Sequence, residues 1–224
     1  MAGINGPKIV TNGLVLCLHA ADRKSYPGSG TSWLDLSGNN NTGTLTNGPT
    51  FNSGNGGNIV FDGSNDIVTT SYKQSSTVFT WSVWFKTNVL SDGVYRNIMS
   101  IPSPNYILVL LNFNSANFGF WTSDSLGGES LSTPTLSTGV WYNIVFVREG
   151  NSITNGYKAY VNSRFYGSAN TGTWSSTDVL SIGGRTDVSQ YFNGNVSNIL
   201  IYNRILSAVE ILQNFNAQRG RFNI

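Results

Sequence analysis

The chain holds three glutamates, Glu129, Glu149 and Glu210, which are the residues best suited to bond-cleaving chemistry on a sugar. Cleavage of a glycosidic bond needs two carboxyl groups placed across it, one as an acid and one as a base or nucleophile. None of the three lies in a Glu-x-Asp-x-x-Glu strand, and Glu210 is placed to cap a helix. His19 is the only histidine, and no Gly-x-Ser-x-Gly turn is present to form a serine triad with it. We therefore expect a protein that is not an enzyme.

Sugar binding is the second kind of chemistry that the residue types permit. A sugar ring stacks on an aromatic side chain, while amides and carboxylates bond its hydroxyl groups. Four aromatic residues with asparagine nearby are candidates for a carbohydrate-binding surface: Trp84, Tyr95, Trp121 and Trp174. In a chain so rich in aromatic residues and asparagine, these residue types more often belong to the core and to turns, and the sequence favours that alternative.

The composition excludes several classes of partner. Charged residues make up 11% of the 224 residues, and the net charge of +2 is too small to attract nucleic acid. No apolar run is long enough to cross a membrane, and the first residues lack the apolar segment of a signal peptide. Cys17, the single cysteine, lies between two leucines, which is typical of a small core residue. These features fit assembly in a cytoplasm rather than secretion.

Short stretches of alternating apolar residues, separated by glycine- and asparagine-rich turns, predict an all-β domain. The clearest strand runs from Val78 to Lys86, with Trp81, Val83 and Phe85 on one face and Trp84 on the more polar face. The segments 58–62 and 66–70 predict a hairpin, as do 157–161 and 164–167, and the segments 94–101, 106–113 and 117–122 predict a meander. We expect a two-sheet antiparallel sandwich.

The end of the chain combines a strand with a helix. Apolar residues occupy both faces of the alternating segment that begins at Tyr191, which predicts a central strand covered on both sides. Ser207 followed by Glu210 has the spacing of a capping box, so one short C-terminal helix should begin there.

These segments resemble the laminin-G-like and pentraxin-like domains, which have the concanavalin-A-like jelly-roll fold. Besides the closing strand and helix, three motifs carry the resemblance: Phe61-Asp62-Gly63-Ser64-Asn65-Asp66-Ile67-Val68, Phe79-Thr80-Trp81-Ser82-Val83-Trp84-Phe85, and Gly139-Val140-Trp141-Tyr142-Asn143-Ile144-Val145. The resemblance implies a jelly-roll sandwich over residues 13–224. Residues 1–12 hold Gly3, Gly6 and Pro7 without periodicity, which predicts an N-terminal arm that is either a frayed terminus or an extension that docks on a neighbouring subunit.

The resemblance also implies a calcium site, since such domains often bind calcium through oxygen ligands on their rim loops. Asp62, Asn65 and Asp66 lie in the matching loop and are the candidate ligands. After Ile182-Gly183-Gly184, where the pentraxin-like pattern has acidic residues, this chain has Arg185 and only Asp187 beyond it. The alternative, that Asp62 and Asp66 only hold backbone amides of a tight turn, is favoured.

The N-terminal segments are similar to virion proteins of tailed bacteriophages, on the following stretches: Gly13-Leu14-Val15-Leu16, Ala20-Ala21-Asp22, Lys24 to Trp33, Asp35-Leu36-Ser37-Gly38-Asn39 and Asn47-Gly48-Pro49. This similarity implies a structural protein of the virion, assembled in the host bacterial cytoplasm. We expect an outer capsid decoration (cement) protein, a homo-oligomer that binds the major capsid protein or other virion proteins. The alternative is a glycan-binding adhesion module on the virion surface, assisted or not by calcium.

Overall fold

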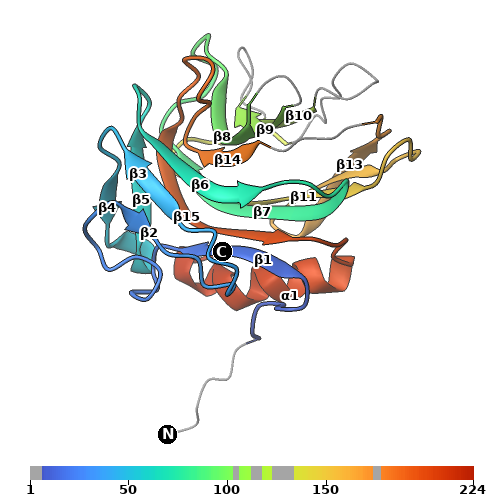
Figure 1. The fold of residues 1–224 in the computed structure, drawn as a ribbon, viewed down its shortest axis with the longest axis horizontal. Coiled ribbons are helices and arrows are strands. Elements are labelled where there is room, and N and C mark those ends of the chain that lie inside the picture. Colours follow the sequence, from blue (N-terminus) through green and yellow to red (C-terminus); the bar gives the residue numbers. More distant parts are fainter. Residues whose placement is uncertain (1–6, 103–105, 112–117, 123–133, 174–177) are drawn as a thin grey trace, which may run out of the picture.

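The computed structural model describes residues 7–102, 106–111, 118–122, 134–173 and 178–224. They form two antiparallel sheets that lie face to face, with one α-helix, α1 (Ala208–Gln218), along the outside of one sheet (Figure 1). The predicted all-β sandwich with a short C-terminal helix is therefore confirmed. Among the described residues, no helix is both long and apolar enough to cross a membrane.

The first sheet has eight strands among the described residues, in the order β13-β12-β11-β7-β15-β5-β4, with β1 also paired to β15. Its strands are β1 (Leu14–His19), β4 (Thr50–Asn52), β5 (Asn58–Asp62), β7 (Val78–Thr87), β11 (Trp141–Glu149), β12 (Tyr157–Val161), β13 (Arg164–Ala169) and β15 (Asn193–Tyr202). The pairing of β12 with β13 confirms the predicted hairpin.

The second sheet has seven strands among those residues, in the order β10-β9-β8-β14-β6-β3-β2. Its strands are β2 (Ser32–Trp33), β3 (Gly43–Thr46), β6 (Ile67–Lys73), β8 (Arg96–Ile101), β9 (Ile107–Leu111), β10 (Phe118–Thr122) and β14 (Val179–Ile182). The consecutive pairing of β8, β9 and β10 confirms the predicted meander. Two short 3₁₀ turns complete the structure, η1 (Gly54–Gly56) and η2 (Arg219–Phe222).

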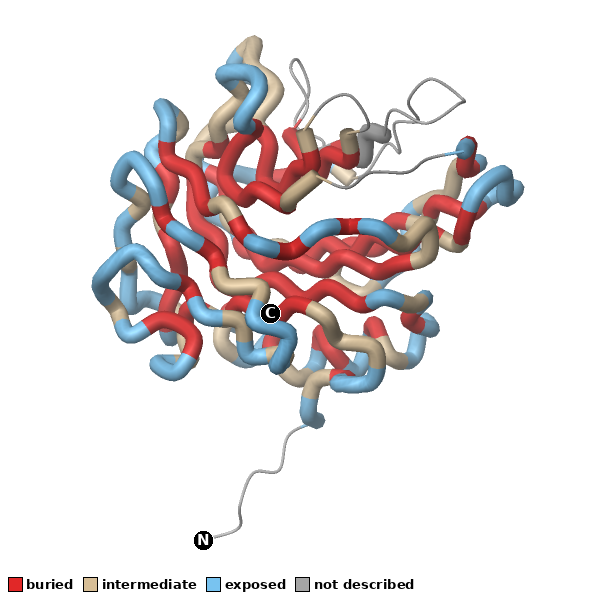
Figure 2. Tube along the Cα trace, viewed as in Figure 1, coloured by how far each residue is buried: buried red, intermediate tan, exposed pale blue. Residues whose placement is uncertain are grey.

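Strand β15 is the centre of the eight-stranded sheet, as its two apolar faces predict. It pairs with β7 along one edge, and its other edge pairs first with β5 and then with β1. One face of β15 packs into the core between the sheets through Val196, Ile199 and Ile201. Leu200 and Tyr202 lie on the other face, against α1. The red, buried segments in Figure 2 follow both layers.

The predicted hairpin between segments 58–62 and 66–70 is wrong. Strand β5 pairs with β15 and β4, whereas β6 belongs to the other sheet and pairs with β3 and β14. The turn between them therefore carries the chain from one sheet to the other. Phe61 and Val68 both point into the common core, so alternation alone does not distinguish a hairpin from a connection between sheets.

Helix α1 begins at the predicted capping box. The side chain of Ser207 accepts a hydrogen bond from the backbone N–H of Glu210, and the Glu210 carboxylate accepts one from the backbone N–H of Ser207. The described end of the arm lies on the same helix: the backbone N–H of Val10 donates to the Asn214 side chain at 2.7 Å, and the Tyr202 hydroxyl donates to the Val10 carbonyl at 2.9 Å. Docking of the arm on a neighbouring subunit stays a prediction.

Replacing Ser207 with alanine should lower the free energy of unfolding by about 1 kcal/mol, because one of the free N–H groups of the first helical turn loses its acceptor. Urea denaturation measures this change. Ser29→Ala, a change at an exposed loop serine, is the control and should have almost no effect. Equal effects of the two substitutions would contradict the capping role.

Cys17 is buried, as predicted, and faces the helix side of the eight-stranded sheet. Burial raises the pKa of its thiol to about 12, so the thiolate is not available at neutral pH.

Candidate functional site

A cavity of about 200 Å³ opens on the seven-stranded sheet, on the side away from the core. We call it the tyrosine cavity. Tyr95 precedes β8, Tyr106 precedes β9, and two further lining residues come from the connection between β14 and β15. The cavity is lined by Tyr95, Tyr106, Leu108, Leu110, Arg185 and Gln190.

The floor of the tyrosine cavity follows from the two-residue period of β9. Ile107, Val109 and Leu111 point into the core between the sheets. Leu108 and Leu110 alternate with them and therefore point to the opposite face of the sheet, where they line the cavity. This strand places apolar side chains at the bottom of a site whose upper parts are aromatic and polar.

Arg185 supplies the positive group of the cavity. Its guanidinium lies 5.2 Å from the centre of the Tyr106 ring, at a distance typical of a cation–π contact. Its Nε donates to Oδ1 of Asp187 at 2.9 Å and its Nη2 donates to Oδ2 at 2.6 Å. The carboxylate thus balances the charge of the guanidinium and fixes its orientation, while the other N–H groups of Arg185 are not used by this pair.

Gln190 supplies the amide. Its Oε1 accepts a hydrogen bond from Nδ2 of the buried Asn97 at 2.8 Å. The amide nitrogen of Gln190 has no protein partner among the described residues and is the group left to donate to a ligand. The side-chain oxygen of Asn97 is buried and has no hydrogen-bond partner among those residues either, which is uncommon for a buried polar atom.

The tyrosine cavity therefore combines aromatic rings, an apolar floor and fixed N–H donors. Aromatic and leucine side chains bury the C–H groups of a sugar ring, and the donors of Arg185 and Gln190 suit its hydroxyl oxygens. The arrangement fits binding of a polyhydroxylated ring rather than bond cleavage.

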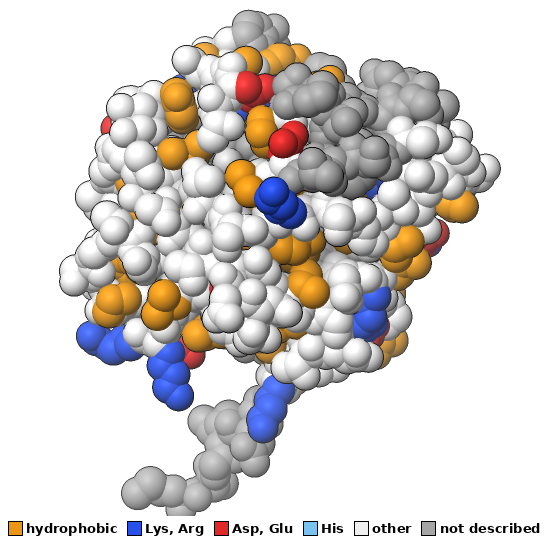
Figure 3. All heavy atoms as spheres, in the orientation of Figure 1, with side chains coloured by type: hydrophobic (Ala, Val, Ile, Leu, Met, Phe, Trp, Pro, Cys, Tyr) orange, Lys and Arg blue, Asp and Glu red, His pale blue; other side chains and the backbone are white. Residues whose placement is uncertain are grey.

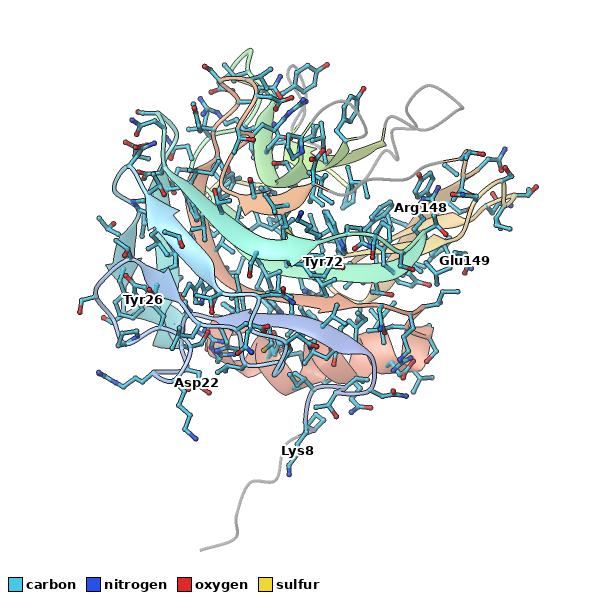
Figure 4. The ribbon with its side chains drawn as sticks, in the orientation of Figure 1. Lys8, Asp22, Tyr26, Tyr72, Arg148 and Glu149 are labelled. Atoms are coloured by element: carbon cyan, nitrogen blue, oxygen red, sulfur yellow. The ribbon has the colours of Figure 1, made fainter. Side chains whose placement is uncertain are left out.

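A larger cavity of about 350 Å³ lies near η1, at the end of the molecule where Figure 4 labels Tyr26 and Asp22. Its lining includes Tyr26, Phe51 and Arg23. Tyr26 is only 3% exposed, and its hydroxyl already donates to the carbonyl of Gly30 at 2.8 Å. Among the described residues, no side-chain amide lines this larger cavity, whereas the tyrosine cavity places the Gln190 amide in the same lining as Arg185, so we take the smaller cavity as the candidate site.

The expectation that Trp84 lines a sugar-binding surface is wrong. Trp84 is 1% exposed, and it stacks on Phe222 at 4.1 Å and on Phe215 at 5.5 Å between ring centres. It does lie on the outer face of β7, as the alternation predicts, but α1 and η2 cover that face. Neither side of its indole is open to a ligand.

Of the other three aromatic candidates, Tyr95 lines the tyrosine cavity. Trp174 and the side chain of Trp121 lie outside the described residues, so their assignment stays a prediction. Tyr106 and Gln190 were not predicted from the sequence, and Arg185 was predicted only as a departure from a calcium-binding pattern. The signal that could have identified Tyr106 is its position immediately before the apolar strand β9, because a side chain there lies at the end of the sheet.

The candidate calcium ligands Asp62, Asn65 and Asp66 lie in the turn between the two sheets. Oδ1 of Asp62 accepts from the backbone N–H of Ser64 at 2.7 Å, and Oδ2 of Asp66 accepts from the backbone N–H of Asp62 at 2.9 Å. Burial raises the pKa of the Asp66 carboxyl, an effect that this amide partly opposes. These bonds match the turn-forming alternative, and no cluster of three histidine, cysteine or acidic residues suited to a metal occurs within the described ranges.

The two glutamates that the structure describes are both ion-paired. Glu149 pairs with Lys158 at the end of β11. Glu210 pairs with Arg204 at 2.6 Å, and this partner together with the Ser207 backbone lowers the pKa of Glu210 to about 2. Glu129 lies outside the described residues.

Residues 61–212 match the model of the concanavalin A-like lectin/glucanases superfamily. A search of curated protein sequences found no match.

Among solved structures, domain 4 of an extracellular arabinanase from Geobacillus stearothermophilus, solved with arabinotriose, is similar with a TM-score of 0.72 and 18% identity, over 91% of this chain and 98% of that one. The binding domain of Paraclostridial Mosquitocidal Protein 1 has a TM-score of 0.71 and 17% identity, over 92% of this chain and 52% of that one. A Trypanosoma rangeli sialidase solved with sialic acid has a TM-score of 0.68 and 17% identity, over 93% of this chain and 33% of that one. The chain thus spans about half of the mosquitocidal-protein binding domain and about a third of the sialidase, and at such identities the likeness shows a shared fold alone.

Proposed function

Because the chain belongs to the concanavalin A-like lectin/glucanases superfamily, we propose that it is a glycan-binding module that acts without catalysis and takes its sugar in the tyrosine cavity. The observation that carries this proposal is the convergence of Tyr95, Tyr106, Arg185 and Gln190 over the leucine floor of β9. Aromatic rings beside fixed donors are the groups that sugar recognition requires.

The structural neighbours support the same proposal. The arabinanase domain was solved with a bound oligosaccharide, and the chain covers almost all of that domain. Another neighbour is the binding domain of Paraclostridial Mosquitocidal Protein 1. Two of the three glutamates support a non-enzymatic role, since Glu149 and Glu210 are each held in an ion pair, with Lys158 and Arg204.

A glycan array followed by calorimetric titration of the best ligand tests the proposal. Tyr106→Ala should weaken binding at least tenfold, because the substitution removes an aromatic wall of the cavity and the ring that lies under the Arg185 guanidinium. The matched control is Tyr166→Ala, which removes an exposed tyrosine of β13, in the other sheet. Titrations with added calcium and with a chelator report whether calcium assists.

Two outcomes would count against the proposal. The array could show no glycan bound in either condition, or Tyr166→Ala could weaken binding as much as Tyr106→Ala. Release of sugar from a bound glycan, lost when a carboxylate is neutralised, would instead support a glycanase.

We also propose, from the similarity to tailed-phage proteins, that the module belongs to a virion and decorates its capsid. Val209 and Leu212 support the proposal: they are exposed on α1, at 74% and 47%, and offer an apolar surface to a neighbouring subunit. Locating the chain on purified particles tests this, and its absence from the head would remove the capsid role while leaving sugar binding unaffected.

A further inference from the structure

We infer that the tyrosine cavity selects a single, uncharged terminal sugar ring and that Asp187 is the residue that rejects acidic sugars. This inference rests on the proposed function, because it names the class of sugar for the same site. It follows from the charges beside the cavity, from its size and from the bonds that hold its donors.

The charge of the cavity is balanced within the protein. An unpaired arginine in a sugar site would attract the carboxylate of a uronic or sialic acid. Here the Asp187 carboxylate already occupies the Nε and Nη2 edge of Arg185 with two hydrogen bonds. An acidic sugar that approached this guanidinium would meet the negative charge of Asp187 at close range, and like charges brought together disfavour the wrong ligand.

A second arginine of the same sheet, which does not line the cavity, is balanced in the same way. Arg96 at the start of β8 pairs with Asp92, and its Nη1 donates to the carbonyl of Tyr191 at 2.9 Å. The hydrogen bond from Arg96 lowers the pKa of the Asp92 carboxyl, so this carboxylate stays ionised. Each of the two arginines is thus matched by one aspartate, so neither ion pair adds a net positive charge that would recruit an anion. The surface in Figure 3 is likewise mostly uncharged.

The size of the cavity limits the ligand to about one ring. Its volume of about 200 Å³ lies below the roughly 300 to 1,000 Å³ typical of pockets for drug-sized ligands. The apolar floor of Leu108 and Leu110 suits the C–H face of one ring, and the cavity offers no second apolar floor beyond β9 among its lining residues. A second ring would therefore find no further apolar floor among the described residues, so the ring that binds is a chain end.

The donors are oriented for neutral hydroxyl groups. Asn97 holds the oxygen of the Gln190 side chain, which leaves the amide nitrogen to donate. The unused N–H groups of Arg185 are donors as well. Hydroxyl oxygens accept from such groups without bringing a charge that the cavity would have to neutralise.

Paired methyl glycosides that differ only at C6, a neutral hexoside and its uronic acid, form the test. Each is titrated into the full chain by calorimetry at low and at moderate salt. For the wild-type protein we expect the neutral glycoside to bind at least tenfold more tightly. Asp187→Asn keeps the shape of the side chain and removes its charge. For this variant we expect the preference for the neutral glycoside to narrow tenfold or to reverse. The affinity of the variant for the uronic acid should fall as salt is added.

Asp92→Asn is the matched control, since it breaks the ion pair of Arg96, and neither Asp92 nor Arg96 lines the cavity. We expect it to leave the preference unchanged. A dimer and a trimer of the preferred sugar should bind within about threefold of the methyl glycoside, because only the end ring is contacted.

The possible results distinguish failure of the charge preference from failure of sugar binding itself. Tighter binding of the uronic acid by the wild-type protein, or a tenfold gain with the trimer, would overturn the inference and leave glycan binding intact. A preference unaltered by Asp187→Asn in the folded variant would remove Asp187 from the argument. If neither glycoside nor any array glycan binds, the proposed function itself fails. The wild-type comparison decides the charge preference even if a variant does not fold.

Discussion

Replacement of Trp84 by alanine is expected to lower the free energy of unfolding by about 3 to 5 kcal/mol. The indole is 1% exposed and lies between the sheet and the C-terminal segments, stacked against Phe215 and Phe222 with interplanar angles of 7° and 16°. Its removal leaves a cavity that the rigid β7 backbone cannot close. Since single domains are stable by only about 5 to 15 kcal/mol, this change alone removes a large part of the total.

The control for this prediction is Trp84→Phe, which keeps an aromatic ring between the two phenylalanines and should cost much less. Urea denaturation gives the stabilities, and the sugar affinity of the folded Trp84→Phe protein is measured alongside. We expect that affinity to equal the wild-type value. A Trp84→Ala protein of nearly wild-type stability that had lost sugar binding would restore the surface role that the burial of Trp84 excludes.

The second large effect concerns pH and the single histidine. His19 lies beside the C-terminal 3₁₀ turn, with its Nε2 3.0 Å from Nη1 of Arg221. Burial, together with the positive charge of Arg221, lowers the pKa of His19 from 6.5 to about 4, although Asp22 opposes this shift. Between pH 6.5 and pH 4 the unfolded chain therefore binds a proton at His19 that the folded chain does not bind.

The sign of the effect follows from that difference. Above pH 6.5 neither state carries the proton and the stability is full. As the pH falls from 6.5 to 4, the unfolded state is protonated first, so the free energy of unfolding should fall by about 3 kcal/mol. Urea denaturation at intervals between pH 7 and pH 4 measures this loss.

The matching control is His19→Gln, whose side-chain oxygen can still accept from Arg221 but cannot titrate. It should flatten the stability profile between pH 6.5 and pH 4.5, above most carboxylate titrations. Because the chain has one histidine, the NMR signal of its ring reports the pKa of His19 directly. A ring that titrates near 6.5 in the folded protein would contradict the buried, arginine-facing position.

Local patterns were sufficient for much of the fold. The period-two alternation of β7, β11 and β15, and the Ser207–Glu210 cap, depend on residues close in the sequence, and each formed as expected. The predicted hairpin at residues 63–65 failed because the partner of a strand depends on the whole sheet. Phe61 and Val68 pack into the same core from opposite sheets, and the residues around them do not show that the two strands lie in different sheets.

The candidate site was less accessible to such reasoning. Tyr95 was selected for its type, and it does line the tyrosine cavity, but Trp84 was selected on the same grounds and is buried. The difference lies in a distant element: α1 and η2 fold back over β7 and cover the indole. Arg185 and Gln190 line the same cavity as Tyr106 from a loop some eighty residues further along the chain, and no motif in the sequence predicts that these segments meet.

The sequence by itself determined that the chain makes a two-layered β-sandwich closed by a capped helix, because alternation and capping are short-range properties of the backbone. Only the tertiary structure decided which outward face stays open. That choice depends on long-range packing, in which the C-terminal segment covers the outer face of the eight-stranded sheet, while the tyrosine cavity opens on the seven-stranded sheet. The pairing of Arg185 with Asp187 then sets the charge of the opening, and with it the class of sugar that we expect to bind.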